Sequence, residues 1–135
     1  MPDFTIRPID TMEGAVFGSF KRARAELGVE SFGMQVIDLP PNAHQYPEHD
    51  HSESGQEEVF IVLRGSGEME IDGERHPMDP DTMIRVGPMP KRKIWPSDQG
   101  MRVLALGGCP GQVYEAPAVT KLGGPEPGVP QVPAS

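Results

Sequence analysis

The chain has 135 residues, a formal charge of −8 at pH 7, 16 glycines, 16 prolines and one cysteine, Cys109. The length predicts one domain with a single core, and the negative charge argues against nucleic acid or an anionic membrane surface as partner. No apolar run approaches the ~20 residues that a membrane helix needs. A lone cysteine excludes an internal disulfide framework and indicates a reducing, cytoplasmic setting.

A helix is expected near the N-terminus. A capping-box pattern begins at Asp10, and Gly28 provides a stop signal. Gly14 and Gly18 weaken the helix by about 1 kcal/mol each, but the apolar spacing still predicts it over about residues 11–27. Apolar residues recur at three- and four-residue intervals at Met12, Val16, Phe20, Ala23 and Leu27.

The following segments read as short strands separated by turns. Asp72-Gly73 is a strong signal for a two-residue hairpin. Short strands at this spacing, with almost no helix after residue 28, predict a sandwich or a barrel. The expected strands and extended pieces are 31–39, 43–51, 59–63, 68–71, 74–76, 82–86, 91–95 and 101–106.

The C-terminal part has a different composition. Prolines and glycines recur from about Gly107 onward and cannot sustain a strand or a helix. We expect Tyr114 to anchor the first part of this tail, and we expect disorder or a loosely packed arm beyond Leu122. The predicted organisation is an N-terminal arm and helix (1–30), a barrel (31–108) and a Pro/Gly-rich C-terminal arm (109–135).

His49, His51 and Glu58 form a candidate metal site. On an extended backbone the two histidines lie on the same face, and Glu58 stands at the head of a buried strand. Two imidazoles and a carboxylate are a recognised set for non-haem Fe(II), and Mn, Ni, Zn or Co could occupy the same site. A His-x-His pair is often incidental, so a metal-free barrel with satisfied histidines is the competing interpretation.

This spacing resembles the first signature of the cupin superfamily: glycine, five residues, His-x-His, three or four residues, Glu, six residues, glycine. His49, His51, Glu58 and Gly65 match it. Ala43 replaces the leading glycine, and six residues separate His51 from Glu58. The resemblance spans roughly residues 32–106.

The second signature of the superfamily is degenerate in this chain. Its pattern is glycine, five residues, Pro-x-Gly, two residues, His, three residues, Asn. Arg92 replaces the histidine that is the fourth metal ligand of the family, and a register shift of one would place Lys93 there. Neither residue can bind a metal while it is cationic. The pattern falls on Asp81, Gly87, Met89, Arg92 and Pro96.

The position of Arg92 suggests a role in ligand binding. A guanidinium beside a dication is unfavourable unless an anion lies between them. We therefore predict that Arg92 binds the carboxylate or phosphate of a small organic ligand that also reaches the metal. A solvated charge, or pairing with a nearby acid, is the alternative. Tyr46 and Gln56 are candidates for contacting the ligand or orienting an imidazole, with a plain loop position as the alternative.

The resemblance implies an all-β, double-stranded β-helix (a jelly-roll or cupin barrel) with a short N-terminal helix and a Pro-rich C-terminal tail. It also implies a homodimer, in which paired edge strands are shielded. One functional hypothesis is a metal-dependent oxygenase or isomerase acting on a small anionic molecule. The other is a metal-free, non-catalytic ligand-binding or structural cupin. A metal-free epimerase needs an inward His–Tyr pair, which the sequence does not locate.

Overall fold

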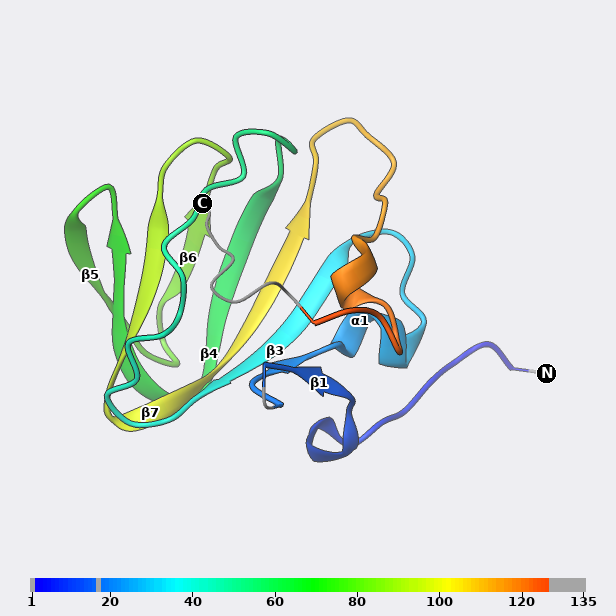
Figure 1. Cartoon of the computed structure of the whole chain (residues 1–135), viewed down its shortest axis with the longest axis horizontal. Helices are drawn as coiled ribbons and strands as arrows, with labels where there is room; N and C mark the ends of the chain where they lie inside the picture. The colour runs from blue at the N-terminus through cyan, green and yellow to red at the C-terminus, as the bar shows by residue number, and fades with distance from the viewer. Residues whose placement is uncertain (1, 17, 127–135) are drawn as a thin grey trace.

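The structure is a computed structural model that describes residues 2–16 and 18–126. Within these residues the regular secondary structure is mostly β-strand with little helix, as predicted. A curved seven-stranded sheet has the order β1-β2-β3-β7-β4-β5, and β6 pairs with β4 (Figure 1). The elements are η1 (Ile9–Thr11), β1 (Gly14–Ala15), β2 (Phe20–Lys21), α1 (Ala23–Leu27), β3 (Gly33–Leu39), β4 (Glu57–Ile71), β5 (Glu74–Met78), β6 (Met83–Val86), β7 (Arg92–Gly108) and η2 (Ala118–Thr120).

The two long strands β4 and β7 run through both walls of the barrel. Residues 57–62 of β4 pair with residues 103–108 of β7, and residues 67–71 pair with residues 92–96. The register shifts between these two stretches, next to Gly65. Gly65 has φ +82°, and a Cβ there would lie 2.1 Å from the Gly100 carbonyl oxygen. Glycine therefore permits this close approach of the two backbones, and the strands can bend.

Because the strands bend at this point instead of ending, two of the predicted strand ends are wrong. The sequence predicted that a strand ends near Gly65, but β4 continues to Ile71. It also predicted separate strands over 91–95 and 101–106, which are parts of the single strand β7. β4 and β7 each continue through the bend because they pair with one another on both sides of it.

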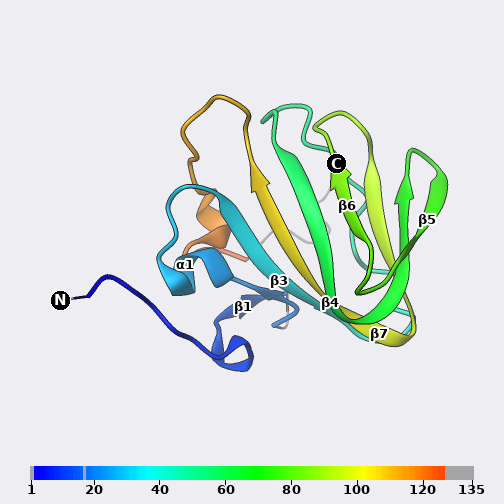
Figure 2. The same ribbon diagram turned by 180° about the vertical axis from the view of Figure 1, so that it is seen from behind.

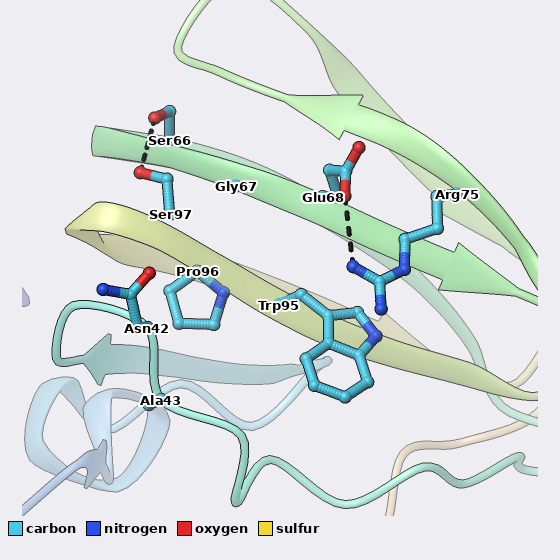
Figure 3. A pocket seen from close by; sticks show the side chains of 9 residues that line it. All are labelled: Asn42, Ala43, Ser66, Gly67, Glu68, Arg75, Trp95, Pro96 and Ser97. Carbon is cyan, nitrogen blue, oxygen red and sulfur yellow. Dashed lines mark hydrogen bonds and ion pairs between the residues drawn. The ribbon is translucent and has the colours of Figure 1, made fainter.

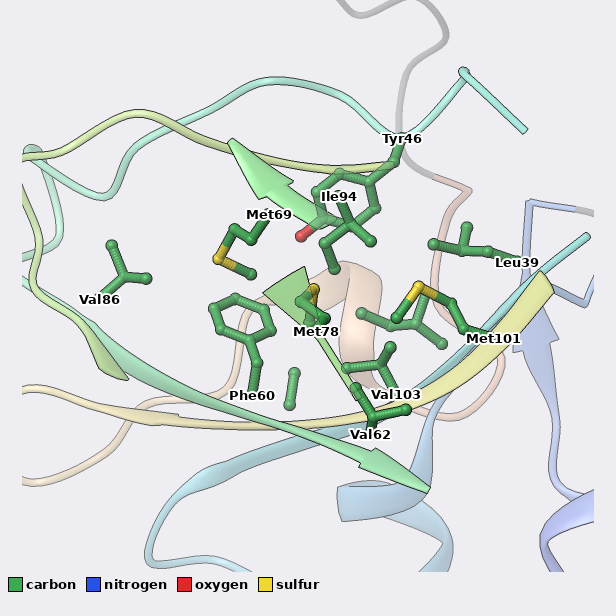
Figure 4. Close-up of a cluster of buried hydrophobic side chains, with 12 residues drawn as sticks. Leu39, Tyr46, Phe60, Val62, Met69, Met78, Val86, Ile94, Met101 and Val103 are labelled. Carbon is green, nitrogen blue, oxygen red and sulfur yellow. The ribbon is translucent and has the colours of Figure 1, made fainter. Parts of the chain in front are cut away.

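The barrel interior is filled by an apolar core (Figure 4). Phe60 of β4 and Ile94 of β7 are 0 % exposed, and each follows the inward alternation of its strand. Burying each such side chain contributes about 1.5–3 kcal/mol. The same alternation points Glu58 and Arg92, two residues before Phe60 and Ile94, toward the barrel interior.

The predicted helix over 11–27 is wrong in most of its length. Only Ala23–Leu27 is helical, and a two-stranded hairpin, β1 and β2, precedes it. β2 adds to the edge of β3 (Figure 2). Gly18 has φ +82°, and a Cβ on Gly14 would lie 2.8 Å from the Gly18 Cα. The two glycines thus form a tight turn, while Gly28 ends α1 with φ +82° as expected.

The tail is docked on the body as far as residue 126. A Cβ on Gly33 would lie 3.0 Å from the Tyr114 hydroxyl oxygen, so the predicted anchoring by Tyr114 is confirmed. Beyond Leu122, the Gly123 amide donates to the Glu13 carboxylate at 2.7 Å. The expected loose arm is therefore wrong for residues 123–126, and residues 127–135 lie outside the described part of the chain.

Arg22 connects this tail to the N-terminal hairpin. Its guanidinium pairs with Glu13 and donates to the carbonyl oxygens of Val119 at 3.0 Å and of Gly124 and Pro125 at 3.2 Å. We call Glu13, Arg22 and residues 119–125 the clasp. In Figure 1 the orange tail lies beside α1. Across the described residues, every helix is too short or too polar to cross a membrane.

Candidate metal centre

His49, His51 and Glu58 lie together inside the barrel. One ligating atom from each of them falls within 4.8 Å of the other two. His51 Nε2 lies 3.2 Å from Glu58 Oε1. The imidazole centroids are 5.0 Å apart, with the ring planes at 86°. The arrangement has the convergence that metal coordination requires, and coordination itself stays a prediction.

The backbone of the two histidines is fixed by neighbouring segments. The His49 amide donates to the Arg92 carbonyl at 3.0 Å, and the Arg92 amide donates back at 2.8 Å. The His51 amide donates to the Pro88 carbonyl at 2.9 Å. The extended piece expected over 43–51 is thus a loop with a single β-bridge, and that bridge sets His49 opposite Arg92.

His49 is prepared to act as a neutral ligand. Its Nδ1 lies 3.0 Å from the Pro47 carbonyl oxygen, which can only accept, so Nδ1 carries the proton and Nε2 keeps its lone pair. Burial lowers the pKa of His49, which favours the neutral imidazole. Metal ligation uses this neutral form.

Two atoms of the cluster have unmet bonding capacity. Among the described residues, His51 Nε2 and Glu58 Oε1 are buried and find no hydrogen-bond partner. Buried polar atoms in proteins are nearly always partnered. Two adjacent buried atoms with lone pairs, together with the neutral His49, form a donor set that fits a divalent first-row metal.

Arg92 occupies the inward position that the degenerate signature leaves open. It is 0 % exposed, and its Nη1 lies 3.7 Å from Glu58 Oε1. Its Nη2 donates to the Gly87 carbonyl, whereas Nε and Nη1 have no hydrogen-bond partner in the described part of the chain. Lys93 points the other way, because its Nζ donates to the His44 carbonyl at 2.9 Å. Arg92 therefore faces the centre, and Lys93 does not.

Tyr46 lies in the wall beside His49. It is 4 % exposed, and its ring centroid is 5.7 Å from that of His49. Burial raises the pKa of Tyr46 far above its usual range, and the Glu58 charge adds to the effect, so the phenol stays protonated. This is the inward His–Tyr pair that the sequence alone could not locate, because Tyr46 sits in a loop without periodicity.

Gln56 lies farther along the same edge. A Cβ on Gly107 would lie 2.6 Å from Gln56 Nε2, so the amide packs over the backbone of β7. The Gln56 side chain therefore covers part of β7. Ligand contact by Gln56 stays a prediction.

A hollow that the sequence did not indicate lies beside Trp95, away from the metal centre (Figure 3). It has a volume of about 310 Å³. The Trp95 indole donates to Glu70 at 2.8 Å, and the Arg75 guanidinium lies 4.4 Å from the Trp95 ring centroid while it pairs with Glu68. These polar groups are partnered by the protein, unlike those of the centre. The lining residues are Asn42, Ala43, Ser66, Gly67, Glu68, Arg75, Trp95, Pro96 and Ser97.

Comparisons with known proteins agree with this fold. The family model described as "Cupin domain" matches residues 35–107, more than half of the chain. No curated protein matches the sequence. A cupin protein from Bacteroides fragilis superposes with a TM-score of 0.68 at 19 % identity, covering 87 % of this chain and 93 % of that chain.

Two further solved structures come from proteins with different functions. A sugar phosphate isomerase of the cupin superfamily from Silicibacter pomeroyi has a TM-score of 0.63 and 23 % identity, covering 76 % of this chain and 74 % of its own. A cupin domain of an XRE family transcriptional regulator from Enterobacter cloacae has a TM-score of 0.51 and 30 % identity, covering 62 % and 86 %. With the family match over residues 35–107 and this shared double-stranded β-helix, the chain belongs to the cupin superfamily.

Proposed function

We propose that the barrel binds a divalent metal ion through His49, His51 and Glu58, and beside it a small anionic organic ligand through Arg92. One observation carries the proposal. The unpartnered atoms of His51 and Glu58 and the unpartnered nitrogens of Arg92 meet in one buried place. The lone pairs of His51 and Glu58 can bind a cation, and the guanidinium hydrogens of Arg92 can donate to an anion.

The metal, when bound, supplies a Lewis acid that polarises an oxygen of the ligand. Fe, Mn, Ni and Zn are the candidates, because affinity discriminates poorly among them. The protein holds the ligands in place. The Pro47 carbonyl orients the His49 ring, and the backbone bridge to Arg92 holds His49 against β7. Tyr46 closes the wall beside His49 and keeps that side of the centre dry.

The ligand class follows from the charge of Arg92. A buried guanidinium forms strong charge-assisted hydrogen bonds with carboxylate or phosphate. The sugar phosphate isomerase from Silicibacter pomeroyi shares the fold at 23 % identity, and its name supports an anionic substrate and an isomerase reaction. An oxygenase is the other reaction that the donor set supports.

A metal-free binding module is the second candidate function. Glu58 accepts no hydrogen bond at Oε1 within the described residues, but the His51 imidazole at 3.2 Å and the Arg92 guanidinium at 3.7 Å lie within ion-pair distance, so its charge is partly compensated without a metal ion. The cupin domain of the XRE family regulator has the same fold, which supports a role without catalysis.

Homodimerisation and a cytoplasmic location stay predictions. The N-terminal arm supports the dimer, because Phe4 and Ile6 are 70 % and 77 % exposed. Large apolar side chains on an extended arm are candidates for burial against another chain.

Metal analysis of protein purified without an affinity tag tests the proposal. We expect about one divalent ion per chain in the wild type, and its loss in His51→Ala, since three ligands become two. His76→Ala is the matched control, because His76 is a partly exposed histidine on β5 that pairs with Glu74. Absence of metal from the wild type, even after incubation with Mn²⁺, Ni²⁺ or Zn²⁺ in formate buffer, would favour the binding module.

A further inference from the structure

We propose that the metal and the anion bind cooperatively at this centre, so that the chain holds a divalent ion tightly only when a carboxylate anion also occupies Arg92. The inference rests on the proposed metal site and adds its regulation. Under this inference, binding of the anion to Arg92 sets the affinity of the site for the metal.

The first argument is the charge balance. Without an ion, the Glu58 carboxylate and the Arg92 guanidinium offset each other at 3.7 Å, with side chains 12 % and 0 % exposed. A divalent ion on Glu58 would take this carboxylate as its own ligand. The buried guanidinium would then lie beside a dication without its counter-ion, which is costly at low local dielectric.

The second argument concerns the other charges near Arg92. Asp50 is the neighbouring acid on the ligand-bearing loop, and the pKa of its carboxyl is lowered chiefly by hydrogen bonds from Ser52, with smaller contributions from the Lys91 and Arg92 charges. Asp50 Oδ1, however, accepts from the amide and hydroxyl of Ser52 at 3.0 and 2.8 Å. Lys91 is exposed and adds positive charge. Tyr46 is neutral, so the described surroundings do not supply a second anion to the guanidinium.

The third argument is the set of free donors on Arg92. Nη2 is fixed on the Gly87 carbonyl, which holds the guanidinium in place. Nε and Nη1 find no hydrogen-bond partner within the described residues, although both are buried. A carboxylate that accepts from Nη1 would replace Glu58 as the partner of Arg92. The same anion carries oxygen lone pairs that a metal ion accepts.

Cobalt titrations in the presence and absence of formate test this coupling. Metal-free protein is titrated with Co²⁺ by calorimetry and by visible absorption, in chloride or formate buffer of equal ionic strength. Allosteric couplings usually change affinity by about 5- to 150-fold, and we expect formate to tighten Co²⁺ binding about tenfold. By linkage, Co²⁺ should tighten formate binding by the same factor.

Arg92→Met is the decisive variant. It should bind Co²⁺ in chloride at least as tightly as the wild type binds it in formate, and formate should have no further effect. Arg92→Lys keeps a cation and should keep part of the formate effect, which preserves the test if the methionine variant folds poorly. Lys91→Met removes an exposed cation next to Arg92 and should behave as the wild type.

The outcomes separate this inference from the proposed function. Equal Co²⁺ affinity of the wild type in chloride and formate overturns the coupling but leaves the metal site standing. A full formate effect in Arg92→Met also overturns it, because formate would then act on the metal alone. No Co²⁺ binding in either buffer overturns the proposed function together with this inference.

Discussion

The clasp and the metal centre each contain a buried arginine, but the two side chains are satisfied very differently. Arg22 is 4 % exposed and all three of its guanidinium nitrogens have partners in Glu13 and residues 119–125. Arg92 is 0 % exposed, and within the described part of the chain only its Nη2 donates a hydrogen bond, to Gly87. A charge buried for structure is surrounded by acceptors, whereas Arg92 retains free donors.

A third arginine supports this distinction. Arg102 on β7 donates to Asp38 at 2.7 and 3.0 Å and to Asp10 at 2.6 Å, and these contacts raise its pKa. Burial of an unpaired charge costs several kcal/mol, so proteins tolerate it mainly where a ligand completes the site. The comparison indicates a structural role for Arg22 and Arg102 and supports the proposal that Arg92 binds a ligand.

Removal of the clasp arginine should give the largest change in stability. Arg22→Met leaves Glu13 without its ionic partner and three backbone carbonyls without donors. Because the Glu13 side chain is 39 % exposed, we expect a loss of about 2–3 kcal/mol, below the full cost of breaking a buried pair. Urea unfolding with linear extrapolation measures it.

Arg85→Met is the control for this measurement. Arg85 pairs with Glu57 on the surface, with side chains 63 % and 38 % exposed. Such pairs contribute about 0–1 kcal/mol. Equal losses in Arg22→Met and Arg85→Met would contradict the structural role of the clasp.

Removal of both charges at the centre should have a smaller effect of the opposite sign. In metal-free protein, we expect Arg92→Met combined with Glu58→Gln to leave the free energy of unfolding unchanged or to raise it by about 1 kcal/mol. Replacing a buried ion pair by groups of similar volume is often neutral or stabilising. Urea unfolding with a chelator present measures the change.

The single variant Glu58→Gln provides the internal comparison. It leaves the Arg92 guanidinium buried without its counter-ion, so it should be less stable than the double variant. A double variant that loses as much stability as Arg22→Met would show that Arg92, too, is held for structure.

The pH dependence of the clasp is the smallest expected effect. The Gly123 amide and the Arg22 guanidinium lower the pKa of Glu13 below its ordinary value of 4.5. The folded protein therefore binds this proton less readily than the unfolded chain does, and the stabilisation is present above pH 4.5 and fades as the pH falls below it. The protection factor of the Gly123 amide, which is its exchange rate by NMR corrected for the intrinsic rate at each pH, should fall on acidification.

Glu13→Gln is the corresponding control. It removes the titrating group, so the loss of Gly123 protection between neutral and acidic pH should disappear. A wild type whose Gly123 amide stays equally protected at low pH would show that the tail is held without the Glu13 charge.

The sequence by itself determined the features that depend on neighbouring residues. Asp72-Gly73 forms the expected hairpin, with φ of +49° and +87°, because few other residues adopt two successive left-handed conformations. The second signature left Arg92 and Lys93 as alternatives for the inward position, and the structure places Arg92 there and Lys93 away from the centre. His49, His51 and Glu58 were found because their spacing resembles a family signature, and the structure brings them within 4.8 Å.

Only the tertiary structure decided the features that depend on residues far apart in the chain. The glycine turn at Gly14 and Gly18 and the pairing of β2 with β3 overrode a helical apolar spacing. The clasp joins Arg22 to a tail about 100 residues away, which no local pattern could indicate. Likewise, the free donors of Arg92 were invisible in the sequence, because hydrogen-bond satisfaction is decided by all the groups that fold around a side chain.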